Sequence, residues 1–99
     1  MQYIVIAYDG ADEKVIERRL AVREQHLKGV EENIKAGRQI YGGAILDDNG
    51  KMVGTMMVMD FDKREELDKW LEIEPYVVEK VWDKIDIQPF KVPPLFIEK

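Results

Sequence analysis

The chain begins with a short apolar run, followed by a long stretch in which apolar residues recur at helical spacing. Residues 3–10, YIVIAYDG, are mostly β-branched or aromatic and end in a turn dipeptide, so they predict a first strand. From Asp12 to Lys35 the apolar residues fall three or four positions apart, and Gly37 provides a stop signal. This pattern predicts one long helix after the first strand.

Two further strands are predicted on either side of a tight turn. The segments RQIYGGAIL (38–46) and KMVGTMMVMDF (51–61) are rich in apolar residues and flank the dipeptide Asn49-Gly50. Asn-Gly is the preferred sequence of two-residue hairpin turns, because both positions need a positive φ. The two segments therefore predict an antiparallel hairpin.

A second helix and a last strand follow. The segment DKREELDKWLEI (62–73) has apolar residues on one helical face, and Asp62 with Glu65 forms a variant of the capping box. The segment PYVVEKV (75–81) predicts a separate short helix, because proline is tolerated best in a first helical turn. WDKIDIQPF (82–90) alternates and predicts the last strand.

The order strand, helix, strand, strand, helix, strand predicts an α+β protein of the ferredoxin-like type, a four-stranded antiparallel sheet with both helices on one face. The strands YIVIAY and MVGTMMVM are apolar on both faces, whereas the helices cover only one. A large uncovered apolar face is rare on a monomer, so we expect a homodimer in which the two sheets pack together. The segment VPPLFI (92–97) could also dock on that face.

Composition narrows the class of protein. The 99 residues, 45% hydrophobic and 35% charged, predict a single globular domain over residues 1–99. A net charge of −5 argues against a nucleic acid or an anionic membrane as partner. The chain lacks a signal peptide and an apolar run of membrane-spanning length, so the cytoplasm is the expected location.

The candidate chemistry lies on the long predicted helix. A helical projection gathers the apolar residues on an arc of roughly 160°, and three basic residues stand inside that arc: Arg19, Arg23 and His26. One interpretation is a polar pocket between helix and sheet that binds an anion, with neutral His26 as a base. The other is that the arginines pair with internal carboxylates and the histidine is an ordinary core or interface residue.

These residues also resemble a known family. The spacing Arg19-x3-Arg23-x2-His26, the segment EPYV (74–77) and the closing IDIQPF (85–90) are together similar to the YCII-related (YciI-like) family over almost the whole chain. The resemblance implies a ferredoxin-like fold, a dimeric α+β barrel and a pocket with a paired His and Asp. One branch of that family removes chloride from a chlorinated hydroxyhydroquinone.

By position, the family's histidine matches His26, and its aspartate falls at Glu74, so this chain has a carboxylate that is one methylene longer. Tyr76 matches the family's aromatic residue after the proline and is a candidate to line the pocket. The family often has Gly-Pro where this chain has Gly43-Ala44, and the adjacent glycines here could let a ligand approach the backbone or form a simple bulge.

Several classes of site are excluded or unsupported. The chain has no cysteine and no serine, which excludes thiolate chemistry and a Ser-His-Asp hydrolase, and its single threonine, Thr55, lies within a predicted strand. One histidine with scattered carboxylates does not make a zinc site, and no phosphate-binding loop follows the first strand. We therefore expect neither a metal nor a cofactor.

The resemblance implies a cofactor-free acid/base enzyme, a lyase such as a dehydrochlorinase or an isomerase, acting on a small anionic, aromatic or enolic substrate. In that interpretation His26 moves the proton, Glu74 orients it, and Arg19 and Arg23 hold the anion. The alternative is a non-catalytic ligand-binding or regulatory module that uses the same basic pocket. A cofactor-free oxygenase is a third hypothesis and rests on analogy of fold alone.

Overall fold

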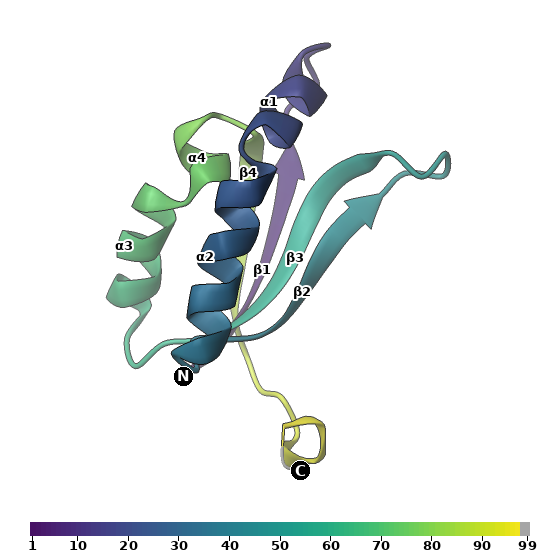
Figure 1. Ribbon diagram of the computed structural model, residues 1–99. Helices are drawn as coiled ribbons and strands as arrows, with labels where there is room; N and C mark the ends of the chain where they lie inside the picture. The colour runs from purple at the N-terminus through teal and green to yellow at the C-terminus, as the bar shows by residue number, and fades with distance from the viewer. Residues whose placement is uncertain (98–99) are drawn as a thin grey trace.

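A single four-stranded antiparallel sheet organises the computed structural model, which describes residues 1–97 (Figure 1). The strands are β1 (Gln2–Asp9), β2 (Gln39–Leu46), β3 (Met52–Asp60) and β4 (Trp82–Phe90), in the spatial order β2-β3-β1-β4. The helices are α1 (Val15–Ala21), α2 (Arg23–Lys35), α3 (Arg64–Ile73) and α4 (Pro75–Val78), with a 3-10 turn, η1, at Pro94–Phe96. This order and topology confirm the predicted ferredoxin-like α+β fold.

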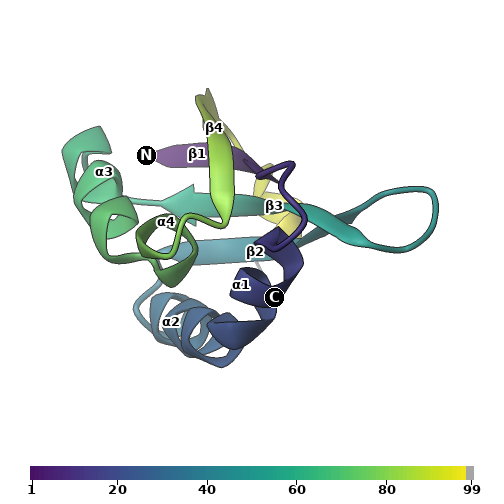
Figure 2. The ribbon, with the colours of Figure 1, turned by 90° about the horizontal axis from the view of Figure 1, so that it is seen from above.

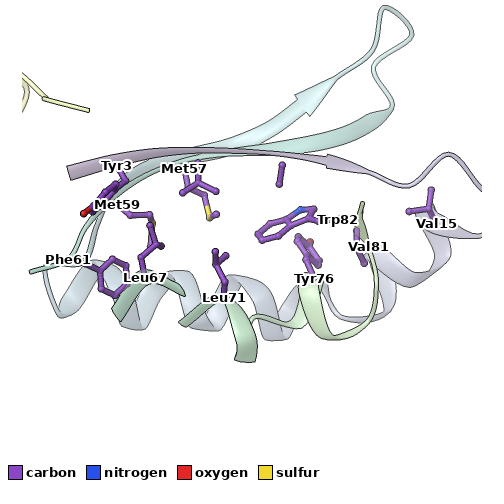
Figure 3. Packing of buried hydrophobic residues seen from close by; sticks show 12 residues of the cluster. Tyr3, Val15, Met57, Met59, Phe61, Leu67, Leu71, Tyr76, Val81 and Trp82 are labelled. Carbon is purple, nitrogen blue, oxygen red and sulfur yellow. The ribbon is translucent and has the colours of Figure 1, made fainter. Parts of the chain in front are cut away.

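The helices lie on one face of the sheet, and the core fills the space between the two layers (Figures 2 and 3). Alternate residues of β1, namely Tyr3, Val5 and Ala7, point into this core and are at most 5% exposed. Leu67 and Leu71 of α3 pack against them from the opposite layer, because they are one turn apart on the same helical face.

The long helix predicted from Asp12 to Lys35 is wrong in one respect, because it is broken at Val22. Val22 has φ −114° and ψ 10°, outside the helical range, and its carbonyl accepts the first hydrogen bond of α2 from the His26 amide. The two helices α1 and α2 therefore form separately, and each carries a buried basic residue, Arg19 on α1 and His26 on α2.

Two predicted helix ends also differ from the structure. The capping box at Asp62 does not form: α3 begins two residues later, with Lys63 at the N-cap position and no side-chain cap. The predicted short helix over 75–81 is confined to Pro75–Val78, because the chain turns at Lys80, whose φ is 57°.

The second face of the sheet carries apolar side chains without a covering layer of helices. The other alternate residues of β1, Ile4 and Ile6, lie on this face opposite Val58 and Met56 of β3. Tyr41 of β2 is 69% exposed. We call these five residues the free face; the expectation that a second subunit covers it stays a prediction.

The carboxyl-terminal segment reaches only one end of the free face. The Val92 amide donates to Oε1 of Gln2 at 2.6 Å, and Val92, Pro93 and Phe96 border a hollow beside Val58. Phe96 is nonetheless 72% exposed, and within the free face Tyr41 is exposed, Ile4, Ile6 and Met56 are half-buried and Val58 is buried.

No helix within residues 1–97 combines the length and the apolar character needed to cross a membrane.

Candidate active site

A pocket of about 320 Å³ opens between α2 and the edge of the sheet formed by β2 and β3. Its walls come from one face of α2, from the β2 backbone around Gly42 and Gly43, from the middle of β3, and from α4. All three basic residues singled out from the helical projection line it: Arg19, Arg23 and His26. A pocket lined by these three basic residues is therefore present between helix and sheet, and most of its remaining lining is apolar.

His26 and Glu74 form a buried pair at the wall of this pocket. Nδ1 of His26 lies 2.6 Å from Oε1 of Glu74, and the two side chains are 8% and 1% exposed. A carboxylate can only accept, so the hydrogen between them belongs to Nδ1. In the neutral ring this leaves Nε2 with a free lone pair, and within residues 1–97 no protein group hydrogen-bonds it.

Glu74 is held in place by its own backbone position. It is the N-cap of α4, and the same Oε1 accepts a hydrogen bond from the Tyr76 amide at 3.1 Å. Pro75 at the first helical position ends α3 and starts α4, which turns the Glu74 side chain towards α2. The Glu74 carboxylate thus reaches His26.

Aromatic rings fix the plane of the imidazole. The Tyr76 ring stacks on His26 with centroids 4.0 Å apart and planes 16° from parallel. Trp82 meets the imidazole with an edge-on geometry at 6.0 Å. Burial raises the pKa of the Tyr76 phenol, although the positive charges of Arg19 and Arg23 oppose the shift. Tyr76 therefore stays a neutral phenol near neutral pH.

Arg19 is engaged by an internal carboxylate rather than free for a ligand. Its Nη1 donates to both oxygens of Asp9 at 2.8 and 2.9 Å, and both side chains are 3% exposed. Its Nη2 donates to the Gly54 carbonyl and to Thr55. Burial raises the pKa of the Asp9 carboxyl, and the Arg19 charge and hydrogen bonds work against that shift. Pairing with an internal carboxylate, the alternative left open by the sequence, thus describes Arg19.

Arg23 differs from Arg19 in its surroundings. It is solvent-exposed, lines the pocket, and forms no ion pair with a carboxylate among residues 1–97. Arg23 is therefore a basic side chain of the pocket that has no carboxylate partner within residues 1–97.

The two glycines of β2 have different constraints. A Cβ on Gly42 would lie 2.8 Å from Nε2 of Gln39 and 3.1 Å from the Met56 carbonyl, whereas a Cβ on Gly43 would meet nothing within 4 Å. Gly43, the glycine singled out from the sequence, does line the pocket. Of the two glycines, Gly42 is therefore the one whose added Cβ would crowd its neighbours.

Sequence reasoning missed Asp9, Thr55 and Trp82 as parts of this site. Trp82 Nε1 donates to Thr55 Oγ1 at 3.2 Å, and Thr55 also accepts from Arg19. The one available signal was for Asp9: strand alternation puts it on the same face as Tyr3, Val5 and Ala7, where a buried carboxylate needs a basic partner.

Within residues 1–97, no group of three or more His, Cys, Asp or Glu side chains is placed to hold a metal ion.

Comparison with known proteins places the chain in a family. The YCII-related domain matches residues 1–91. The chain belongs to the YCII-related family. Among its relatives, Protein YciI of Escherichia coli O6:H1 is 30% identical over 97 residues, which cover 92% of this chain and 97% of that protein. An uncharacterized protein of Haemophilus influenzae is 31% identical over the same length and coverage.

A solved structure has the same fold. It is 5-chloro-2-hydroxyhydroquinone dehydrochlorinase (TftG) from Burkholderia phenoliruptrix, in complex with 2,5-dihydroxybenzoquinone. It aligns with a TM-score of 0.80 over 96% of this YCII-related chain and 98% of its own, at 17% sequence identity. At that identity the similarity establishes the fold, and the chemistry must be argued from the residues of this chain.

Proposed function

We propose that this YCII-related protein is a cofactor-free acid/base enzyme in which His26 transfers a proton to or from a small anionic substrate. The observation that carries the proposal is the buried 2.6 Å contact between His26 Nδ1 and Glu74, on the wall of a pocket. A carboxylate behind an imidazole fixes the tautomer and stabilises the imidazolium that forms when Nε2 takes a proton.

The pocket suits an elimination or an isomerisation. In an elimination, Nε2 of His26 takes a proton from a hydroxyl or carbon of the substrate, and the electron pair of the broken bond moves into the substrate and expels an anionic leaving group. One proton and one anion leave, so no oxidant or reductant is required. Glu74 stabilises the His26 imidazolium until the imidazolium returns the proton to solvent.

Arg23 and Arg19 have separate parts in this proposal. Arg23 is exposed in the pocket without a carboxylate partner among residues 1–97, so it binds the substrate anion and the charge that develops on it. Arg19 is saturated on both terminal nitrogens by Asp9, Gly54 and Thr55. Its guanidinium lies 4.8 Å from the centre of the Tyr76 ring, and it therefore supports the stack behind His26.

The substrate class is supported by the structural neighbour. That enzyme is a dehydrochlorinase of a chlorinated hydroxyhydroquinone and was solved with a dihydroxybenzoquinone. Such molecules are flat, oxygen-rich and readily anionic, which suits a pocket with a guanidinium, an imidazole and apolar walls. We propose substrates of this small aromatic or enolic type.

The test is turnover of a panel of halogenated hydroquinones, beginning with 5-chloro-2-hydroxyhydroquinone, followed by chloride release. We expect His26→Ala to lower kcat by about 10²-fold or more, the usual contribution of general acid/base catalysis. Lys28→Ala, on the exposed face of the same helix, is the matched control and should keep full activity. Equal turnover by His26→Ala and wild type would remove His26 from the chemistry.

A second candidate function is a non-catalytic ligand-binding or regulatory module. It is favoured by the pocket-lining Arg23, which has no ion-pair partner within residues 1–97 and would serve binding whether or not a proton moves. This function predicts that ligands are released unchanged, with affinity lost in Arg23→Ala and largely kept in Glu74→Gln.

We also propose that the protein is a homodimer whose two sheets pack through the free face. The support is the apolar character of that face: Ile4, Ile6 and Met56 have no covering helix layer, and Tyr41 is 69% exposed. The test of this assembly is given in the Discussion.

A further inference from the structure

The hydroxyl of Thr55 has an unusual set of partners. Its oxygen accepts from Nη2 of Arg19 at 3.0 Å and from Nε1 of Trp82 at 3.2 Å. Both partners are pure donors, and a hydroxyl oxygen has two lone pairs, so its accepting capacity is filled. The single hydroxyl hydrogen must therefore point away from both.

That hydrogen has no protein acceptor in the part of the chain that the structure describes. Thr55 is 3% exposed, and within residues 1–97 the only hydrogen bonds of its hydroxyl are the two that it accepts. Thr55 lines the same pocket as His26 and Arg23. A buried donor without a partner costs free energy, so the pocket side of Thr55 is where an acceptor is expected.

The groups behind Thr55 make its hydroxyl a rigid and strong donor. Arg19 is held by two hydrogen bonds to Asp9, and Trp82 is packed in the core, so neither can release the oxygen easily. A guanidinium that donates to the oxygen polarises the O–H bond, which strengthens donation from the hydrogen. Asp9 balances the Arg19 charge, so this position offers a directed hydrogen rather than a free cation.

We propose that Thr55 donates a hydrogen bond to an oxygen of the bound ligand, a carbonyl or phenolate oxygen of a hydroxyquinone-like molecule. This inference rests on the proposed function and assigns to it a specificity residue. Arg23 supplies charge from the open side of the pocket, and Thr55 supplies a fixed neutral donor from its floor on β3. Together they would select ligands with an oxyanion and a second, correctly spaced oxygen.

The experiment measures the affinity of 2,5-dihydroxybenzoquinone for the full-length wild type and three variants by titration calorimetry. Thr55→Val keeps the shape and removes the hydroxyl, so we expect a loss of about tenfold or more, as for a hydrogen bond to a charged acceptor. Thr55→Ser restores the hydroxyl and should bind within about threefold of wild type.

Trp82→Phe provides a second route if Thr55→Val folds poorly. It keeps the hydroxyl but frees one lone pair, so the hydrogen can rotate, and affinity should fall by about three- to tenfold. Circular dichroism of each variant establishes that it is folded.

The outcomes separate this inference from the proposed function. Wild-type affinity in both Thr55→Val and Trp82→Phe would overturn the role of Thr55, while loss of turnover in His26→Ala would leave the proposed function standing. Equal loss in Thr55→Val and Thr55→Ser would also overturn it, because the hydroxyl would then not be the group that matters. If the wild type does not bind 2,5-dihydroxybenzoquinone, the inference is overturned, because hydroxyquinone-like molecules are then not its ligands. The proposed function would still stand if the enzyme turned over another substrate.

Discussion

Glu74 has two roles, because it caps α4 and also holds the imidazole of His26. Substitutions of Glu74 should therefore separate the effect of helix capping from the effect of orienting His26. Its Oε1 accepts from the Tyr76 amide at 3.1 Å, as the N-cap of α4, and from His26 Nδ1 at 2.6 Å. Glu74→Ala removes this acceptor and with it both hydrogen bonds. Loss of an N-cap costs about 1 kcal/mol. A buried donor left without its partner costs about 1–3 kcal/mol.

The expected cost of Glu74→Ala is therefore about 2–4 kcal/mol of unfolding free energy. At about 4–8 °C per kcal/mol for a domain of this size, Tm should fall by roughly 10–30 °C. Glu74→Gln keeps an oxygen acceptor for both donors, so it should cost about 1 kcal/mol, the difference between a charged and a neutral acceptor.

Glu74→Asp restores the residue type of the family and separates the two roles. Aspartate is a favoured N-cap residue, so capping of α4 should survive. Its carboxylate is drawn back by about 1.5 Å, one carbon–carbon bond, which takes the 2.6 Å contact with His26 to roughly 4 Å. We expect an intermediate stability and an imidazole that is no longer fixed.

The assay is urea unfolding followed by circular dichroism, with Glu72→Ala, an exposed position on α3, as the matched control. The control should change stability by less than about 0.5 kcal/mol. A Glu74→Ala variant no less stable than Glu72→Ala would refute the reasoning. So would an Asp variant as unstable as Ala, since capping would then contribute nothing.

Three further predictions concern other parts of the molecule. The hydrogen bond from Arg18 holds the pKa of Asp12 at about 2, below its ordinary 3.8, so the stability from this pair is present above pH 3.8 and is lost as the pH falls to about 2. Arg18→Ala should raise the pKa of Asp12 measured by NMR titration, and an unchanged pKa would contradict the pairing. If the free face is a dimer interface as proposed, Ile6→Glu should give a monomer in analytical ultracentrifugation where the wild type is a dimer, with Glu17→Lys on the exposed side of α1 as a charge-changing control. A wild type that is already monomeric would contradict this role of the free face. Gly42→Ala should lower the free energy of unfolding by about 1–3 kcal/mol, the range for overpacking, whereas Gly43→Ala should leave it nearly unchanged in the same urea assay. Equal effects of the two substitutions would show that the crowding of Gln39 is unimportant.

The elements that local sequence determines were predictable. The apolar segments on either side of Asn49-Gly50 predicted the hairpin, although within residues 1–97 only Gly50 of these two turn residues takes a positive φ, 81°. The strand β4 begins at Trp82 and ends at Phe90 as predicted, because its signal lies within a few adjacent residues. The break at Val22 was not predictable from periodicity, since the apolar spacing continues across it. It depends on what α1 and α2 each contact elsewhere.

The site was predictable only in part, for a similar reason. The three basic residues on the apolar side of the long predicted helix indicated a pocket between helix and sheet. The family resemblance indicated Glu74 as the partner of His26, 48 residues away. The Asp9–Arg19 pair and the hydrogen bonds to Thr55 join four separate elements, β1, α1, β3 and β4, so no short segment of the sequence indicates which residues pair. Asp9 precedes a glycine, so its sequence neighbourhood is typical of a turn rather than a buried ion pair.

The central claim, that Glu74 holds His26 with Nε2 available to a ligand, can be measured directly because His26 is the single histidine of the chain. Long-range proton–nitrogen NMR of the protein, recorded with the ring neutral, reports which nitrogen carries the hydrogen. We expect the hydrogen on Nδ1, and a shift of the Nε2 signal on addition of 2,5-dihydroxybenzoquinone. A ring protonated on Nε2 with Nδ1 bare would contradict the pair, since such a ring cannot donate to Glu74.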